Sequence, residues 1–183
     1  MTDETFWKDK SVILDTNILS QLAKEKRADK FRPVFDFFKN NNIDPLLIDA
    51  TYFELLGFTA NKSDFDFLAE WVKQFPILPT KSEDVELASL LSSYYKNLDP
   101  ELNKKQISYC DCLHAAQLIK FGGRVFIVTT DIHDYPISIF DIKSIQIIED
   151  NKKAVLVGFI TFNKEKLEKA RINFEKSIQE KRG

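Results

Sequence analysis

Three short apolar runs, separated by helical patterns, constrain the fold of this chain more than any other feature. They occupy residues 12–14, 45–48 and 125–128, and each is too short to form a helix. Between them, apolar side chains recur every three or four residues, as in residues 31–38 and 65–75. Strands that alternate with helices favour an α/β/α sandwich with a central, mostly parallel sheet.

The last part of the chain departs from this alternation. Residues 144–148 and 154–159 are predicted to form two further strands, and apolar residues between 167 and 178 give one face of a charged terminal helix. The sequence shows no internal repeat, low-complexity segment or convincing linker. We therefore expect one domain of residues 1–183, in which residues 145–183 form a C-terminal extension of strands and an amphipathic helix.

Composition excludes several classes of protein. Hydrophobic residues make up 44% and charged residues 30% of the chain, which is typical of a globular protein. No apolar run is long enough to span a bilayer, and the charged first ten residues lack the apolar stretch of a signal peptide, so we expect a cytoplasmic protein. The net charge of −2 argues against binding nucleic acid through the whole surface. Cys110 and Cys112 are interpreted as buried thiols, since two cysteines are too few for a zinc site.

Four acidic residues lie where such a fold would gather a ligand. Asp15 directly follows the first apolar run, and Asp131 follows the third by two threonines. The carboxyl ends of parallel strands meet at one edge of the sheet, which is where open α/β sheets bind ligands. Glu54 and Asp111 lie near the starts of helices, and Ser108 is the expected cap of the second of these.

Each of these acids also has a simpler explanation when taken alone. Asp15 could cap a helix, Glu54 could face solvent, Asp111 could complement the positive end of its helix, and Asp131 could be a turn residue. These local explanations account poorly for four acidic positions that converge near one edge of one sheet.

Clustered carboxylates predict a metal ion. Carboxylates held together repel one another and take up protons, and a divalent cation offsets that repulsion. Hard oxygen ligands suit Mg²⁺ or Mn²⁺. A cation of this kind binds phosphodiester oxygens and orients or activates a water, so an acidic pocket can receive an anionic substrate.

The segments around these acids resemble, in order, the four motifs of PIN-domain nucleases, over roughly the first three quarters of the chain. The segments are ILDTNIL at residues 13–19, ATYFEL at 50–55, DCLHAA at 111–116 and IVTTDIHDY at 127–135. The overall pattern is most similar to the VapC-like toxins of bacterial toxin–antitoxin pairs. The resemblance implies a Mg²⁺-dependent endoribonuclease that hydrolyses RNA, forms a homodimer and is blocked by an antitoxin protein.

Position suggests a role for each acid. Asp15 and Asp111 are the expected direct metal ligands. Glu54 is expected to hold a metal-bound water or to help activate the nucleophile, and Asp131 completes the cluster.

Other residues are expected to support the acids. Asn17 and Thr130 are candidates for hydrogen bonds that orient the carboxylates. Asp134 is an alternative to Asp131, and a structural or substrate-side role is favoured for it. His114 and His133 are interpreted as packed or surface histidines, because this chemistry activates water through the metal.

Two other functions fit parts of the pattern. A phosphatase of the haloacid-dehalogenase kind also begins with an Asp after the first strand, but it needs a second Asp where this chain has Asn17. A PIN-like module without activity could serve as a scaffold. Basic side chains outside the acidic cluster could bind substrate phosphates: Lys24, Lys26, Arg27, Lys104, Lys105 and Arg124.

Overall fold

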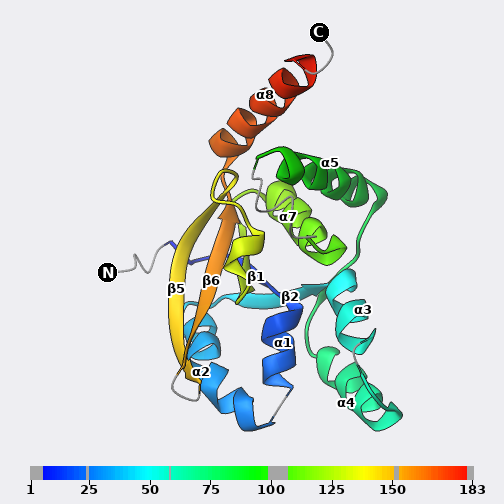
Figure 1. Ribbon diagram of the computed structural model, residues 1–183. Helices are drawn as coiled ribbons and strands as arrows, with labels where there is room; N and C mark the ends of the chain where they lie inside the picture. Colours follow the sequence, from blue (N-terminus) through cyan, green and yellow to red (C-terminus); the bar gives the residue numbers. More distant parts are fainter. Residues whose placement is uncertain (1–5, 24, 58, 99–106, 151–152, 181–183) are drawn as a thin grey trace.

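The computed structural model describes residues 6–23, 25–57, 59–98, 107–150 and 153–180 (Figure 1). In these ranges a mixed sheet forms the centre of the molecule, with strand order β3-β2-β1-β4-β6-β5. Its strands are β1 (Ser11–Leu14), β2 (Asp44–Ile48), β3 (Ile77–Leu78), β4 (Val125–Thr129), β5 (Phe140–Asp150) and β6 (Lys153–Phe162).

β1 lies in the middle of the parallel part of the sheet. It pairs in parallel with β2 on one side and with β4 on the other, and β3 extends the parallel part beyond β2. β6 then pairs antiparallel with β4 and β5. The mostly parallel sheet predicted from the sequence is confirmed. The short strand β3 was not predicted.

Helices cover both faces of the sheet, with α5 and α7 on one side and α1 and α2 on the other (Figure 1). No helix within the described ranges is both long and apolar enough to cross a membrane. The helices are α1 (Thr16–Leu22), α2 (Glu25–Asn40), α3 (Asp49–Gly57), α4 (Lys62–Val72), α5 (Ser82–Leu98), α7 (Tyr109–Phe121) and α8 (Lys164–Glu180), with a short 3-10 turn η1 (Ile132–Asp134).

Alternating side chains of the strands enter two separate cores. Ile13 and Ile127 pack in the core shared with α5 and α7. Val12, Leu14 and Phe126 pack in the core shared with α1 and α2. Because both faces are buried, the strands are apolar throughout, which is why the sequence shows them as continuous apolar runs.

The C-terminal strands belong to the same sheet as the rest. β5 starts at Phe140, before the extension expected from residue 145, and pairs along its length with β6. Asn163 caps α8 by accepting from the backbone N–H of Lys166 at 3.1 Å, and the Nζ of Lys166 lies 2.8 Å from Asp141 on β5. The rings of Tyr94 and Phe174 then pack at 4.8 Å, so α8 contacts α5 as well as the hairpin.

Gly158 on β6 allows the close approach of η1. A Cβ at this position would lie 2.8 Å from Cγ1 and 3.0 Å from Cδ1 of Ile132. We expect Gly158→Ala to lower the free energy of unfolding by about 1–3 kcal/mol, as overpacking commonly does. Chemical denaturation measures the change.

Gly57→Ala is the matched control, because a Cβ there meets nothing within 4 Å. The cost of Gly158→Ala should also fall when Ile132→Ala removes the clashing atoms. An unchanged stability of Gly158→Ala would contradict this account of the contact.

Candidate metal centre

The four acidic residues selected from the sequence line one cavity at the carboxyl edge of the parallel strands. The cavity has a volume of about 300 Å³. Asp15 and Asp131 follow β1 and β4, whereas Glu54 lies on α3 and Asp111 in the first turn of α7. The lining residues are Asp15, Thr16, Asn17, Ser20, Glu54, Ser108, Asp111 and Asp131.

Asp15 is buried and directly precedes α1. Its backbone carbonyl, rather than its carboxylate, accepts the hydrogen bonds from the first turn of the helix. Its carbonyl accepts from the N–H groups of Ile18 and Leu19, while its side chain makes no capping hydrogen bond. Oδ2 accepts instead from the hydroxyl of Thr129 and from Nδ2 of Asn17, both at 2.6 Å. The carboxylate is therefore held in the cavity, and the simpler explanation of Asp15 as a helix cap does not account for its side chain.

Asn17 joins the two acids that follow strands. Its Nδ2 lies 2.6 Å from Asp15 Oδ2 and 3.1 Å from Asp131 Oδ2. Its Oδ1 accepts from the backbone N–H of Thr130 at 3.2 Å. Asn17 thus fixes the end of β4 relative to the start of α1.

Thr129 is a site residue that the sequence reasoning missed. Its buried hydroxyl donates to Asp15 and accepts from the backbone N–H of Asp131 at 2.9 Å. Thr130, the threonine named from the sequence, contributes its backbone N–H to Asn17. The β1–β4 register ends at Leu14↔Val128, so one further step brings Asp15 beside Thr129. That register is the signal that would have identified Thr129.

Asp111 is positioned by the cap of its own helix. Ser108 accepts from the backbone N–H of Asp111 at 3.0 Å, and its hydroxyl donates to Asp111 Oδ2 at 2.6 Å. The expected cap at Ser108 is present, and α7 ends at Phe121, where Gly122 follows with a φ of 47°.

The remaining acids differ in how they meet the cavity. The Thr16 hydroxyl donates to Glu54 and holds that carboxylate across from α1. Asp131 is exposed, whereas Asp134 is buried and is not among the lining residues. Asp134 is nevertheless close enough for its charge to help raise the pKa of Asp111.

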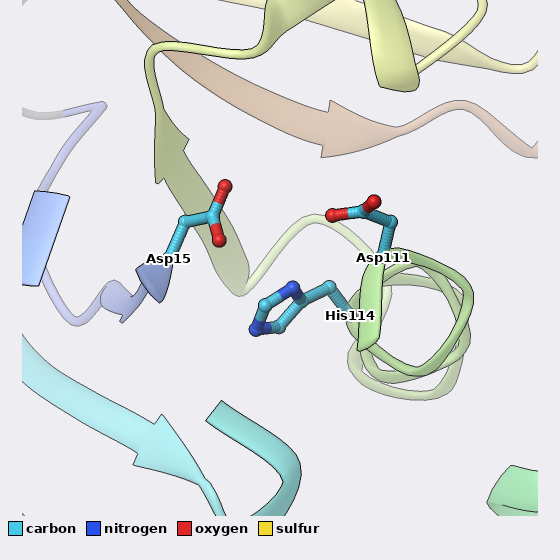
Figure 2. A group of neighbouring side chains, drawn as sticks. All are labelled: Asp15, Asp111 and His114. Atoms are coloured by element: carbon cyan, nitrogen blue, oxygen red, sulfur yellow. The ribbon is translucent and has the colours of Figure 1, made fainter. Parts of the chain in front are cut away.

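His114 lies beside Asp15, which is buried, and Asp111, which is half-buried (Figure 2). Asp15, Asp111 and His114 each place one possible ligand atom within 4.8 Å of the other two, a group that could bind a metal ion. The sequence favoured a packed histidine, and the ring is fully buried, but it packs next to the carboxylates rather than away from them. His133 is exposed.

Burial shifts the protonation of this group. It raises the pKa of Asp15 to about 7, and the charges of Asp111 and Asp131 add to the effect. It raises the pKa of Asp111 to about 6, with further contributions from Asp134 and Glu54. Burial also lowers the pKa of His114 to about 3, so the ring is neutral at ordinary pH. When both carboxyl groups are ionised, their negative charges repel each other. A bound cation offsets this repulsion, so ionisation of the two acids and binding of a cation favour each other.

The basic residues named from the sequence add little to the described site. Arg124 precedes β4, at the edge of the sheet opposite the acids, and is exposed. Lys24, Lys104 and Lys105 lie outside the described residues, as do the side chains of Lys26 and Arg27.

Comparison with known proteins gives a match to one family model and to one solved structure. The model of the PIN domain matches residues 12–135, which include all four acids. The crystal structure of FitAcB from Neisseria gonorrhoeae contains a chain of similar fold, with a TM-score of 0.51 and 21% identity, covering 68% of this chain and 90% of that one. No curated protein sequence matches this chain.

The raised pKa of Asp15 predicts an unusual dependence of stability on pH. In metal-free protein the unfolded carboxyl ionises near its ordinary value of 3.8, whereas the folded one keeps its proton up to about 7. The free energy of unfolding should therefore fall as pH rises through this interval, by at most roughly 4 kcal/mol from this residue. Denaturant titrations in the presence of a chelator measure it.

Asp15→Asn should remove the part of that fall that Asp15 contributes, because its amide does not ionise, whereas the part from Asp111, whose pKa is raised to about 6, should remain. Asp29→Asn is the control, since Asp29 is an exposed carboxylate paired with Arg32 on α2. A stability that stays flat across this pH interval in the wild-type protein would contradict the prediction.

Proposed function

The chain belongs to the PIN-domain family, and on that premise we propose that it is a Mg²⁺- or Mn²⁺-dependent endoribonuclease that hydrolyses RNA phosphodiester bonds. The observation that supports this most is the convergence of Asp15, Glu54, Asp111 and Asp131 on one cavity within the matched residues. The four acids come from four separate segments of the chain. If each were only a helix cap or a turn residue, nothing would require them to meet in one cavity.

The donor set suits a hard divalent cation. The cavity offers carboxylate oxygens, Asp15 is buried and Asp111 half-buried, and no Lys or Arg is among the described residues that line it. Asp15 and Asp111 would hold the ion, with Glu54 and Asp131 completing its surroundings. When bound, the metal ion supplies positive charge beside the negative phosphodiester oxygens and lowers the pKa of a bound water.

The protein's own contribution is to fix these carboxylates before substrate arrives. Asn17 and Thr129 hold Asp15, and Ser108 holds Asp111. Asn17 also keeps Asp131 near Asp15. Thr16 orients Glu54, which we assign to positioning or deprotonating the attacking water. Ligands held in place in this way do not have to reorganise during the reaction.

An adjoining cavity supports a single-stranded nucleic acid as substrate. It has a volume of about 670 Å³ and shares Glu54 and Ser108 with the acidic cavity. Phe53 and Tyr109 line it with side chains that are 79% and 58% exposed. Exposed aromatic rings beside a phosphate-binding site are suited to stacking unpaired bases.

We further propose that the chain acts as a toxin inhibited by a cognate antitoxin that blocks the acidic cavity, and that it forms a homodimer. The motif resemblance to VapC-like toxins supports this, and an RNA substrate is consistent with action in the cytoplasm. Residues 1–183 would act as one domain, since β5 and β6 continue the sheet of the matched region. A neighbouring gene for a small DNA-binding antitoxin, and loss of cleavage when its product is added, test the pairing.

Neutralising the direct ligands tests the activity. We expect Asp15→Asn and Asp111→Asn to reduce metal-dependent RNA cleavage by more than about 100-fold, because each removes a ligand charge. Gel assays on structured and unstructured RNA measure cleavage, and circular dichroism checks the fold. Asp29→Asn should cleave normally.

Undiminished cleavage by the folded variants would overturn the proposal. If Mg²⁺ and Mn²⁺ also failed to raise the melting temperature, the alternative of a PIN-like scaffold would be favoured, because a ligand of the folded state must stabilise it. The phosphatase alternative is disfavoured, since Asn17 occupies the position of its second Asp and has its amide engaged with Asp15.

Aromatic substitution tests the substrate cavity. Phe53→Ala and Tyr109→Ala should raise KM for single-stranded RNA and change kcat little, since a stacked base contributes roughly 1–3 kcal/mol. Phe65→Ala is the control, because Phe65 is 42% exposed and is not among the residues that line the acidic cavity or its neighbours. Equal effects of the three variants would contradict a base-binding role.

A further inference from the structure

One nitrogen of His114 is buried without a hydrogen-bond partner. The side chain is fully buried, and its Nε2 lies 2.7 Å from Oγ1 of Thr51 on α3. Its Nδ1 has no partner within the described residues. Leaving a buried polar atom unpaired costs about 1–3 kcal/mol, and nearly all such atoms in native proteins are paired. The position of Nδ1 therefore requires an explanation.

The unpaired nitrogen faces the carboxylates of Asp15 and Asp111. Figure 2 shows the ring of His114 beside Asp15 and Asp111, with one ring nitrogen directed toward the space between the carboxylates. Asp111 and His114 are three residues apart on α7 and so share a helix face. One ligand atom from each of the three lies within 4.8 Å of the others. With metal–ligand distances of about 2.1 Å, adjacent ligands of one octahedral ion lie about 3.0 Å apart and opposite ones about 4.2 Å, so the three side chains would have to draw together around a metal.

The side-chain hydrogen bonds to Asp15 and Asp111 reach one oxygen of each carboxylate. The side-chain donors to Asp15, Thr129 and Asn17, both reach Oδ2, and the hydroxyl of Ser108 reaches Oδ2 of Asp111. Backbone N–H groups of Thr16 and Ser108 also bond to Asp15 and Asp111 respectively. Among the described residues, these side-chain donors engage Oδ2 and not Oδ1 of each carboxylate. The space between the two carboxylates lies in front of Nδ1.

The contacts of Thr51 are compatible with a proton on Nε2 of His114. Its Oγ1 lies 3.8 Å from Cys110 Sγ as well as 2.7 Å from Nε2. When the Thr51 hydroxyl donates its one proton to the sulfur, it accepts from Nε2–H, and Nδ1 then presents a lone pair to the carboxylates. A hydrogen bond from the second ring nitrogen is the usual support of a metal-binding histidine.

We propose that Nδ1 of His114 binds the metal ion directly together with Asp15 and Asp111, and that this nitrogen makes the site prefer Mn²⁺ to Mg²⁺. The proposal rests on the metal site of the proposed function and adds a ligand to its acids. Imidazole nitrogen suits first-row transition metals, whereas Mg²⁺ favours oxygen ligands and bound water. Thr51 acts as a positioning residue for the ring.

Electron spin-echo spectroscopy of Mn²⁺ bound to the full chain tests the assignment, since it detects a nitrogen bound directly to the ion. The chain contains only two histidines. His133→Gln changes the exposed one and leaves His114 as the single source of imidazole nitrogen. We expect this protein to show nitrogen coupling to Mn²⁺, and ¹⁵N-labelled histidine to change the signal.

His114→Gln is the complementary variant, because its amide can keep the hydrogen bond to Thr51 while lacking Nδ1. It should lose the nitrogen coupling and weaken Mn²⁺ binding by about tenfold or more, with a smaller change for Mg²⁺, measured by calorimetry. Thr51→Val should weaken Mn²⁺ binding in the same direction, whereas Thr51→Ser should keep it. The labelling experiment on His133→Gln remains decisive if a substitution at His114 impairs folding.

The outcomes separate this inference from the proposed function. Mn²⁺ that binds the His133→Gln protein without nitrogen coupling would overturn the role of His114 and leave an all-carboxylate site. An equal affinity for Mn²⁺ and Mg²⁺ would overturn the metal preference. Failure of the wild-type protein to bind either ion would overturn both the ligand assignment and the metal-dependent activity.

Discussion

The parallel pairing of β1 with β4 is the constraint on which the site depends. The pairing runs from Ser11↔Val125 to Leu14↔Val128, and the N–H of Asp15 still donates to the Val128 carbonyl at 3.2 Å. Two segments more than a hundred residues apart in sequence therefore end at the same level. Because both faces of these strands are buried, a one-residue slip would exchange the side chains of the two cores. The apolar packing thus fixes the position of the polar residues beyond it.

Burying acidic groups at that edge creates a tension that the local hydrogen bonds relieve only in part. Thr129, Asn17 and Ser108 donate to the carboxylates and favour their ionised forms, but burial outweighs these contacts and raises the pKa of both Asp15 and Asp111. The site is therefore organised for charge that the protein alone does not neutralise. This is the balance expected where a structure gives up stability to bind a ligand.

α3 and α7 are coupled through the same site. Thr51 and Glu54 come from α3, and Asp111 and His114 come from α7. Thr51 contacts His114 on the buried side, while Glu54 and Ser108 separate the acidic cavity from its larger aromatic neighbour. Any movement of these two helices would alter the proposed metal site and the proposed base-binding cavity together.

The sequence by itself determined the layers of the fold and the positions of the four acids. Short continuous apolar runs, a helical period of about 3.6 and capping residues are local features of the sequence, so β1, β4, α7 and the cap at Ser108 could be identified without a structure. Only the tertiary structure decided what each acid meets. The hydroxyl beside Asp15 belongs to Thr129 because of the strand register. β3 is a strand because it pairs with β2. One nitrogen of His114 faces the acids because Thr51 of α3 contacts the other nitrogen. Such contacts join residues distant in sequence, and no local pattern records which of them will face each other.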